Sequence, residues 1–511
     1  MRLEKAKNTK RGIVYGVANK VATLVLPFFV QTVTIRTLGI EYVGIKGLFS
    51  SILAVLSLSE LGIGTAIVYN MYKPIAEDDI DTIGALLNLY KKLYRIIGTV
   101  VLCFGLAVIP FLKLLIKGDY PSEINLQYVF LLYLTNTILS YWLFAYKSSL
   151  LSAYQRIDVI SIIGTVTQTL TCVFQIVFLL LTKNFYVFLV LSIIFTVFNN
   201  IIISICVDRM YPEIKCRGDI SDDLKNKIKT NVAGLIIGKV SGTTRNTFDS
   251  IFMSMFLGLT QAAIYSNYFY VLTALDGFTG IVSTSLLAGV GNSIAIESKE
   301  TNYKQMMILH TSYLIISGWM AICMLCLYQP FMQLWVGKDF LFPGYVMVLF
   351  PLYFYISKLG DIRAVYADGA GLFWENRHRT LLEAIANIIL NYLFVKKWGA
   401  FGIVLATIIT LFFIGFLGST IVIFKHYFEH GMKEYLLNSF FYLSVTSGVG
   451  GAVYFAFSRI PVTSPLEALI VRAICCITVI PAIYILVISS RRDFKESYCW
   501  LKRVLFRSKL L

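Results

Sequence analysis

The feature that most constrains this chain is a series of long apolar segments that extends over almost its whole length. A helix of about 20 apolar residues crosses the hydrocarbon core of a bilayer, where backbone groups can be satisfied only within helices or closed barrels. The sequence therefore predicts an all-α polytopic membrane protein with about 14 transmembrane helices. The candidate spans are residues 13–36, 43–69, 93–116, 124–146, 157–181, 185–207, 230–257, 260–290, 304–327, 344–367, 379–395, 400–424, 435–457 and 465–489.

The composition leaves little chain for anything except membrane helices. Of the 511 residues, 57% are hydrophobic and 14% are charged, against about 45–50% and about 25% in soluble domains. No connection between predicted spans exceeds about 25 residues, which is too short for a nucleotide-binding, glycosyltransferase or redox domain. The sequence contains no P-loop, G-x-S-x-G or Rossmann glycine motif, so ATP-driven transport by this chain alone is disfavoured. Any chemistry is expected inside the helical bundle.

No bound metal or other cofactor is expected. The nine cysteines lie mostly in apolar segments, which argues against a disulfide framework. Cys323 and Cys326 form a C-x-x-C without a second pair, and we interpret them as small apolar side chains within a span. His426 and His430 lie four residues apart but lack the further ligands of a metal motif.

The distribution of lysine and arginine predicts the orientation of the chain. If the N-terminus is inside, the cytoplasmic segments hold about thirty basic residues and the opposite segments about seven, and cytoplasmic connections normally carry the excess. We therefore expect both termini in the cytoplasm and a retained first span. The same asymmetry explains most of the net charge of +16 through topology and attraction to anionic membrane lipids, without a nucleic-acid partner.

An internal repeat divides the chain. At a gapless offset of 219 residues, Leu38-Gly39 falls on Leu257-Gly258, and Lys20 falls on Lys239. Parallel repeats are common in secondary transporters, which place the substrate at the repeat interface and alternate access by rocking one lobe against the other. We predict an N-lobe at 1–207, a cytoplasmic inter-lobe loop at 208–229, a C-lobe at 230–424, and two further spans with a basic cytoplasmic tail at 425–511.

Ionisable side chains inside the spans are the candidate functional residues. A charge at the bilayer centre costs about 2.5–3.5 kcal/mol on insertion scales, so such residues usually face a cavity or a partner. Arg36, Lys46 and Arg472 lie near span ends and are expected to snorkel to the interface. The candidate cationic cavity comprises Lys20, Lys239, Arg245, Lys358 and Arg363, and the candidate ion-coupling carboxylates are Glu60, Asp249, Asp276 and Asp361.

Lys20 and Lys239 are the leading pair of cations. The repeat makes them equivalent, and each lies about 12 Å from the cytoplasmic end of its span at 1.5 Å per residue. The alternative is that each lysine snorkels or pairs with a local carboxylate. Arg245 and Asp249 lie four residues apart on one helix face, where they can form an internal pair or serve the substrate.

The remaining charges also have two interpretations, and for the first group mutual neutralisation is the simpler one. Lys358, Asp361 and Arg363 are close in sequence, so mutual neutralisation competes with a functional role. Glu60 and Asp276 each lie alone in a predicted span. An isolated carboxylate in a membrane is either a proton or sodium site or a structural group that is hydrogen-bonded by its neighbours.

Three segments of the chain resemble a known family. They are LSLSELGIGTAIVYNMYKPIAEDDIDTIGALLNLYKKLYRIIG (Leu56–Gly98), AYKSSLLSAYQR (Ala145–Arg156) and LGLTQAAIYSNYFYVLTAL (Leu257–Leu275). They resemble the bacterial Wzx-type polysaccharide flippases of the multidrug/oligosaccharidyl-lipid/polysaccharide (MOP) exporter superfamily. The resemblance covers most of the first eight spans, whereas spans thirteen and fourteen match by hydropathy alone.

The resemblance implies a V-shaped, MATE-like pair of six-helix lobes followed by two extra helices. Wzx-type proteins are associated with moving undecaprenyl-pyrophosphate-linked oligosaccharides to the outer leaflet of the bacterial cytoplasmic membrane, for capsule and exopolysaccharide synthesis. The resemblance also implies that the polysaccharide polymerase or the assembly machinery is a protein partner. Only the cationic first and seventh spans, here Lys20, Lys239 and Arg245, can be matched to the family's functional residues.

The residues and the resemblance both favour an anionic cargo. Lys or Arg in a low-dielectric cleft attracts a pyrophosphate more strongly than at the surface. We expect a flippase, not an enzyme, driven by a sodium or proton gradient. The alternatives are a cation-coupled multidrug antiporter on the same fold, which the excess of intramembrane cations disfavours, a lipid II flippase, and a membrane polysaccharide polymerase or ligase. The last usually presents a larger extracytoplasmic loop than this chain offers.

Overall fold

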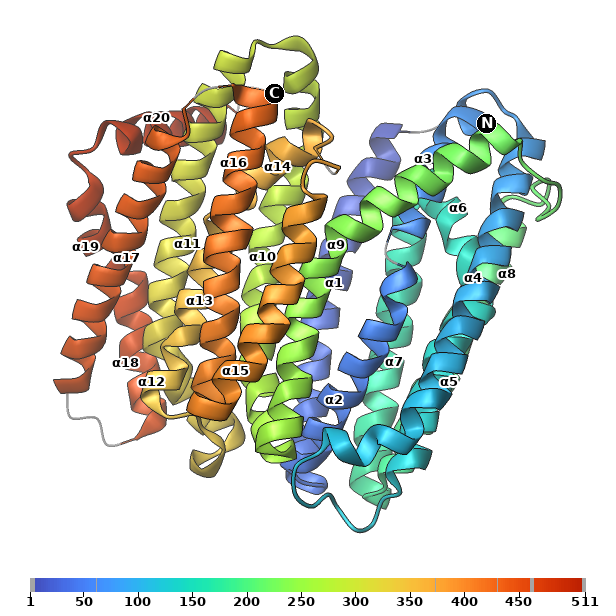
Figure 1. The fold of residues 1–511 in the computed structure, drawn as a ribbon, viewed down its shortest axis with the longest axis horizontal. Helices are drawn as coiled ribbons and strands as arrows, with labels where there is room; N and C mark the ends of the chain where they lie inside the picture. Colours follow the sequence, from blue (N-terminus) through green and yellow to red (C-terminus); the bar gives the residue numbers. More distant parts are fainter. Residues whose placement is uncertain (1–4, 61, 373, 430, 460–463, 508–511) are drawn as a thin grey trace. The chain divides into compact units, whose positions relative to one another are not determined.

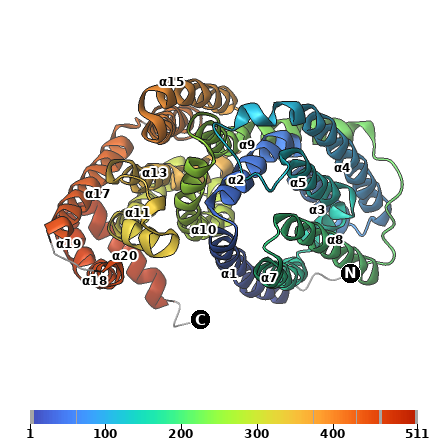
Figure 2. The same cartoon turned by 90° about the horizontal axis from the view of Figure 1, so that it is seen from below.

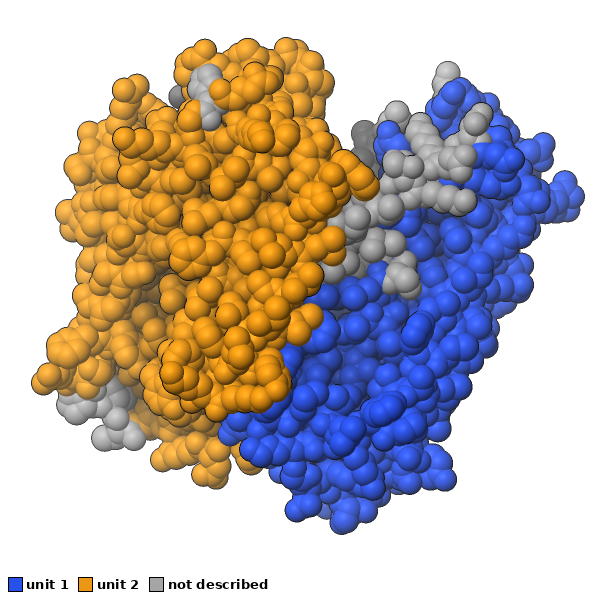
Figure 3. Space-filling view, viewed as in Figure 1, with its two compact units in different colours: residues 1–263 blue, residues 264–511 orange. Residues whose placement is uncertain are grey.

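The computed structural model describes residues 5–60, 62–372, 374–429, 431–459 and 464–507, and within these ranges it contains helices and no strand (Figure 1). The chain forms two compact units, residues 1–263 and 264–511 (Figure 3). The predicted all-α polytopic fold is confirmed. Within the described residues, ten helical stretches are long and apolar enough to cross a membrane, or eleven if the bent pair at 126–153 is one span.

The first unit is built from α1 to α9 and the first turn of α10. Its helix α1 packs mainly on α7, α7 packs on α8, and α5 packs on α8 and α4 (Figure 2). The bounds are α1 (Lys5–Thr37), α2 (Ile40–Leu56), α3 (Ile63–Ala76), α4 (Ile80–Val108), α5 (Leu126–Trp142), α6 (Ser148–Ala153), α7 (Ile157–Thr182), α8 (Phe185–Met210), α9 (Asp222–Leu257) and α10 (Leu259–Ile296).

In the second unit α11 is the central helix, with α13, α17, α18 and α20 packed against it. Helix α15 continues through wider π-helical turns at Leu411–Gly418 and Phe424–Phe428. The bounds are α11 (Lys299–Val336), α12 (Gly344–Met347), α13 (Leu349–Lys358), α14 (Asp361–Gly369), α15 (Arg377–Thr410), α16 (Ser419–Ile423), α17 (Lys433–Arg459), α18 (Pro465–Ile477), α19 (Val479–Ile488) and α20 (Arg492–Arg507).

The sequence predicts fourteen spans, whereas ten or eleven helical stretches of the structure meet the length and hydropathy of a span. The two sets differ where a helix is broken or carries charged residues. The predicted spans 379–395 and 400–424 fall in one helical stretch that kinks at Gly399, where φ is 56° and ψ is −134°. The predicted span 43–69 is interrupted by the 3₁₀ turn Ser57–Glu60 between α2 and α3. The predicted span 230–257 lies in α9, which carries several charged residues. The count of fourteen therefore stays a prediction.

The helix boundaries reproduce the internal repeat. Gly39 and Gly258 both have positive φ, 113° and 92°, and each separates the first two helices of its repeat. Glycine adopts this conformation without the strain that a Cβ causes. Helices α4 and α11 also begin at equivalent positions, after Asp79 and Ser298, whose side chains each accept a hydrogen bond from the backbone N–H three residues later. Both repeats thus use a glycine between their first two helices and a side-chain cap at the start of an equivalent later helix.

The boundary between the compact units differs from the predicted lobe boundary. The predicted loop 208–229 overlaps the end of α8 and the first turns of α9, so the connection between these helices is shorter, at 211–221. Helix α9 packs on α2 and α3 and groups with the first unit. The compact units divide after Ala263, within α10. The assignment of 1–207, 230–424 and 425–511 as lobes and C-terminal helices stays a prediction.

A glycine permits α2 to pack closely against the start of α10. A Cβ at Gly44 in α2 would lie 2.3 Å from the carbonyl oxygen of Leu259 at the start of α10. Because that atom belongs to the backbone, it cannot move aside as a flexible side chain would. We expect Gly44→Ala to destabilise the protein by about 1–3 kcal/mol through overpacking, measured as a lower melting temperature of the purified protein in detergent.

The matched control is Gly448→Ala in α17, where an added Cβ meets nothing within 4 Å. Alanine favours a helix over glycine, so this variant should melt at the same temperature as the unmodified chain or higher. Equal melting temperatures for Gly44→Ala and Gly448→Ala would contradict the close approach of α2 to α10.

Candidate functional site

The structure places the predicted cations in both units. Lys20 on α1 is exposed, and no described side chain forms an ion pair with it. Arg245 and Asp249 lie on α9, where Asp249 is buried and both residues take part in interactions. Lys358 and Arg363 lie in the second unit, in α13 and α14. The side chain of Lys239 and the residue His430 lie outside the described part of the chain.

Lys358 is the centre of an ion-pair cluster in the second unit. Its side chain is only 7% exposed, and its Nζ lies 2.9 Å from Oδ1 of Asp276 on α10 and 3.1 Å from Oδ2 of Asp361. Tyr313 on α11 donates a hydrogen bond of 2.6 Å to the same Oδ2. Asp276 is isolated in its own predicted span, as the sequence indicates, but in the fold α13 brings Lys358 to it. Lys358 and Asp361 form an ion pair, which agrees with the interpretation of mutual neutralisation.

Arg363 belongs to a buried polar layer beside this cluster. Its side chain lies close to Tyr435 of α17, which donates a hydrogen bond of 2.8 Å to the carbonyl of Leu359 at the break between α13 and α14. The Tyr435 ring contacts His310 of α11, whose Nε2 lies 2.9 Å from Oγ of Ser439. His310 is fully buried and was not singled out from the sequence. The layer joins α11, α14 and α17.

Glu60 lies at the break between α2 and α3 and is held by tyrosines. Tyr94 of α4 donates to Oε1 at 2.9 Å, and Tyr141 of α5 donates to Oε2 at 2.6 Å. Tyr90 in turn donates to the hydroxyl of Tyr94 at 2.7 Å. At the repeat offset Tyr94 is equivalent to Tyr313, so each repeat uses the same tyrosine to bind a carboxylate. These bonds satisfy both carboxylate oxygens of Glu60 within the helical bundle. The coupling role of Glu60 stays a prediction.

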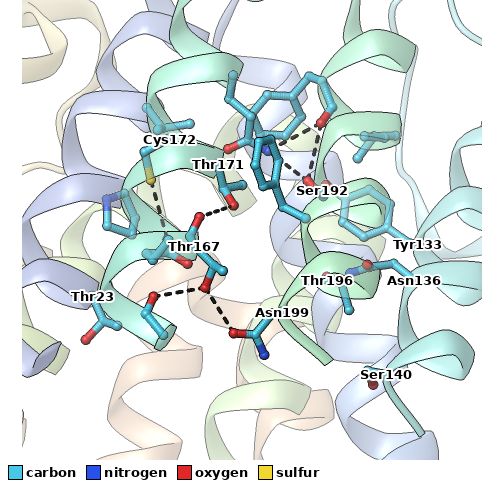
Figure 4. Close-up of a pocket in the computed structure, with 18 of the residues that line it drawn as sticks. Thr23, Tyr133, Asn136, Ser140, Thr167, Thr171, Cys172, Ser192, Thr196 and Asn199 are labelled. Atoms are coloured by element: carbon cyan, nitrogen blue, oxygen red, sulfur yellow. Dashed lines mark hydrogen bonds between the residues drawn. The ribbon is translucent and has the colours of Figure 1, made fainter. Parts of the chain in front are cut away.

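A polar cavity of about 620 Å³ lies inside the first unit, between α1, α2, α5, α7 and α8 (Figure 4). Its polar lining shares a simple pattern: hydroxyl and amide side chains recur at intervals of four residues along α7 and α8. Thr167, Thr171 and Gln175 form this stripe on α7, while Ser192, Thr196 and Asn200 form it on α8. Residues four apart share a helix face, so this stripe was a signal that the sequence analysis missed.

Hydrogen bonds between polar side chains hold the walls of the cavity together. Thr167 donates to Oδ1 of Asn199 at 3.0 Å, and Gln175 donates to the hydroxyl of Ser192 at 2.7 Å, which joins α7 to α8. Asn19 of α1 donates to the hydroxyl of Thr165 of α7 at 3.1 Å. In a membrane, such bonds and close packing replace the hydrophobic effect as the force between helices.

Three buried polar atoms in the cavity wall have no hydrogen-bond partner among the described residues. They are the hydroxyl of Tyr133, Oδ1 of Asn136 and Nδ2 of Asn200. Leaving such a group unsatisfied costs about 1–3 kcal/mol, so polar cavities normally bind water or a ligand. The ring of Tyr133 is fixed by an edge contact of 5.9 Å with Phe49 of α2. These atoms are therefore positioned to form hydrogen bonds with water or with a ligand that enters the cavity.

Lys46 of α2 supplies the charge in this cavity. The described lining residues include no acidic side chain, and no described side chain forms an ion pair with Lys46. The sequence analysis expects Lys46 to snorkel to the interface, whereas the structure places its side chain in the wall of this cavity. The predicted span begins at residue 43, whereas α2 begins at Ile40, which places Lys46 about 9 Å along the helix. The cavity is consequently cationic and rich in uncharged hydrogen-bonding groups.

Arg472 also finds a partner within the fold instead of snorkelling. Its guanidinium donates a hydrogen bond of 3.1 Å to the carbonyl of Cys326 and lies over the ring of Phe457, 5.4 Å from its centroid. This bond joins α18 to α11.

No family model and no curated protein matches the sequence, but solved structures match the fold. The lipid II flippase MurJ, in an inward closed conformation, is 14% identical and covers 94% of this chain and 99% of its own, with a TM-score of 0.60. An inward-facing multidrug resistance MATE family transporter of the MOP superfamily is 13% identical and covers 80% and 94%, with a TM-score of 0.60.

A third structure is a MOP superfamily transporter from Pyrococcus furiosus, described by a reverse polarity of its binding pocket that suggests a different function. It is 12% identical and covers 83% of this chain and 95% of its own, with a TM-score of 0.56. At such identities the similarity concerns the fold. The chain is thus a multi-pass membrane protein with the fold of the MOP superfamily transporters and flippases that it resembles.

The geometry of the Lys358 cluster predicts a structural role for this lysine. Lys358→Met would leave Asp276 and Asp361 without their cation, and breaking a buried pair by removing one partner costs about 3–5 kcal/mol. We expect the lower end of this range, because the two carboxylates are 32% and 28% exposed. Thermal unfolding of the purified protein measures the loss.

Lys304→Met is the matched control, since it breaks an exposed pair of 2.8 Å with Glu300. Such surface pairs contribute about 0–1 kcal/mol, so this variant should unfold almost as the unmodified chain does. A Lys358→Met protein as stable as the control would show that the cluster does not hold the second unit together.

Proposed function

We propose that this protein is a flippase that moves undecaprenyl-pyrophosphate-linked oligosaccharides across the bacterial cytoplasmic membrane for capsule or exopolysaccharide synthesis. The observation that carries the proposal is the polar, cationic cavity inside membrane helices that have the MOP transporter fold. Sugar hydroxyls that leave water lose free energy unless they are hydrogen-bonded again. The hydroxyl and amide groups of α7 and α8 supply such bonds, and Lys46 favours an anionic cargo.

A cation-coupled multidrug antiporter is less consistent with this site. Lys46 would repel a cationic compound, and the described lining offers no carboxylate to compensate. Repulsion of this kind is a common source of specificity against a class of ligands. The Pyrococcus furiosus transporter shows that a binding pocket of reversed polarity occurs on this fold. We therefore prefer an anionic, glycan-bearing cargo.

A lipid II flippase is the second candidate function. The match to MurJ extends over 94% of this chain and almost all of that protein. Both candidates predict movement of a pyrophosphate-linked saccharide by alternating access, and they differ in the glycan. A membrane polysaccharide polymerase or ligase has no such support from the fold.

The proposed mechanism assigns the pyrophosphate to Lys20 and Lys239, the equivalent cations of the first and seventh predicted spans. The exposure of Lys20 on α1 supports access from outside the helix core. Arg245, Lys358 and Arg363 complete the proposed cationic set, although the ion pairs of Lys358 favour a structural part for it. The lipid tail is expected to stay in the bilayer while the sugars pass through the hydrophilic interior.

We propose that a sodium or proton gradient drives the cycle through Glu60, Asp249, Asp276 or Asp361. An ion shifts a conformational equilibrium only if it binds the two states with different affinity. Glu60, at the break between α2 and α3, is the preferred candidate. Its described partners are neutral tyrosines, whereas Asp276 and Asp361 already share Lys358.

Helix α20 supports the proposed orientation and partners. Its basic residues Arg492, Lys495 and Lys502 accompany an exposed Tyr498. This combination is typical of helices that lie on an anionic membrane surface. We therefore propose cytoplasmic termini in contact with anionic lipids, with the polysaccharide polymerase or assembly machinery as a further partner.

Reconstitution tests the proposed function and the pyrophosphate site together. In proteoliposomes, the protein should move an undecaprenyl-pyrophosphate oligosaccharide, scored by access of an external probe to the glycan, faster under one imposed sodium or proton gradient. The double variant Lys20→Gln with Lys239→Gln should abolish movement while inserting normally, because it removes both cations. Lys304→Gln, an exposed cytoplasmic change, is the control and should keep transport.

Each outcome points to a different conclusion. Normal transport by the double variant would remove Lys20 and Lys239 from the site. Movement of lipid II but not of the oligosaccharide would favour the second candidate. No glycan movement, in vesicles that expel a cationic dye, would transfer the proposal to a drug antiporter.

A further inference from the structure

We propose that the cavity of the first unit binds an acidic sugar of the cargo glycan, with the carboxylate of a uronic acid paired to Lys46. The inference deepens the proposed function, on which it rests for the source of the glycan. It concerns Lys46 and a cavity whose described lining does not include Lys20, and nothing in the sequence resemblance assigns a role to Lys46.

The first argument is the charge of Lys46. An ammonium group within membrane helices normally has a carboxylate partner or faces water, as Lys358 shows with Asp276 and Asp361. Lys46 has no ion pair with any described side chain, and it lines a cavity without a described acidic residue. An anionic ligand in the cavity supplies the missing counter-charge.

The second argument is the amount of charge. One lysine balances one negative charge, and the other described lining residues are uncharged. A carboxylate carries a single charge, whereas a phosphate monoester carries about −1.5 to −2 at neutral pH. A phosphate would therefore bring uncompensated charge into a low-dielectric site. The cavity matches a monoanion better than a phosphate monoester.

The third argument is the type of polar groups. Sugar hydroxyls both donate and accept hydrogen bonds, and the unpartnered atoms include the Asn136 oxygen, the Asn200 nitrogen and the Tyr133 hydroxyl. The hydroxyl and amide stripe of α7 and α8 extends this surface. Figure 4 shows its members Thr167, Thr171, Ser192 and Thr196 around the same space. Its volume of about 620 Å³ falls within the range of about 300–1,000 Å³ for small-molecule sites.

Equilibrium dialysis of the purified full-length protein against labelled disaccharides tests the proposal without requiring transport. The probes are a glucuronosyl-glucose, the matched glucosyl-glucose and the same glucosyl-glucose carrying a 6-phosphate. We expect the uronic acid probe to bind at least tenfold more tightly than the neutral one. Lys46→Gln should remove this preference, and Lys46→Arg should retain most of it because the charge is kept.

Cys172 provides a reporter of the position. Its thiol lies in the cavity wall, where it accepts a hydrogen bond of 3.4 Å from Gln168. The bound uronic acid probe should slow alkylation of Cys172, quantified by peptide mass spectrometry, but leave the exposed Cys499 of α20 unaffected. Lys304→Gln and melting temperatures of all variants control for folding.

Several results would overturn the proposal. They are equal binding of the acidic and neutral probes, a preference that survives Lys46→Gln in a folded protein, and tighter binding of the phosphate than of the carboxylate. Absence of detectable binding of the uronic acid probe at tens of millimolar would also overturn it. Transport of a neutral lipid-linked glycan would leave the flippase proposal intact while removing the acidic-sugar site, so the two failures are distinguishable.

Discussion

The structure of this protein depends on one constraint: polar groups inside the membrane must find partners within the protein, because lipid offers none. The described charged and hydrogen-bonding side chains accordingly gather into a few groups. Tyrosines surround Glu60, two aspartates surround Lys358, and an amide and hydroxyl lining surrounds Lys46. These groups fix how the helices pack, and they are also the places where a substrate or a coupling ion can act.

Two of these groups coincide with breaks in helices. Glu60 ends the 3₁₀ turn between α2 and α3, and Asp361 begins α14 directly after the break that follows Lys358. A break leaves backbone groups without their helical partners, so polar side chains gather where these groups need satisfaction. In both repeats a tyrosine, Tyr94 or Tyr313, donates to the carboxylate at the break. Discontinuous helices of this kind form substrate and ion sites in many secondary transporters.

Lys46 and Lys358 show that a lysine in a membrane span can have either of two roles. Lys358 is paired with two carboxylates, those of Asp276 and of Asp361, so its charge is compensated by the protein. Lys46 lines a cavity with uncharged walls, so its charge is available to a ligand. In sequence both are single lysines in apolar surroundings. The difference arises from helices far apart along the chain, since Asp276 reaches Lys358 only when α10 and α13 are folded.

The sequence by itself determined the features that depend on local chemistry. Apolar length predicted the membrane helices, and the alignment of Leu38-Gly39 with Leu257-Gly258 predicted the repeat. The structure then showed that Gly39 and Gly258 form equivalent turns and that Asp79 and Ser298 cap equivalent helices, features that also depend on chemistry within a few residues. Only the tertiary structure decided that Lys46 lines a cavity, that Asp276 is paired, and that tyrosines hold Glu60. Those facts depend on which helix faces pack together. A nearly uniform apolar sequence does not specify this packing locally.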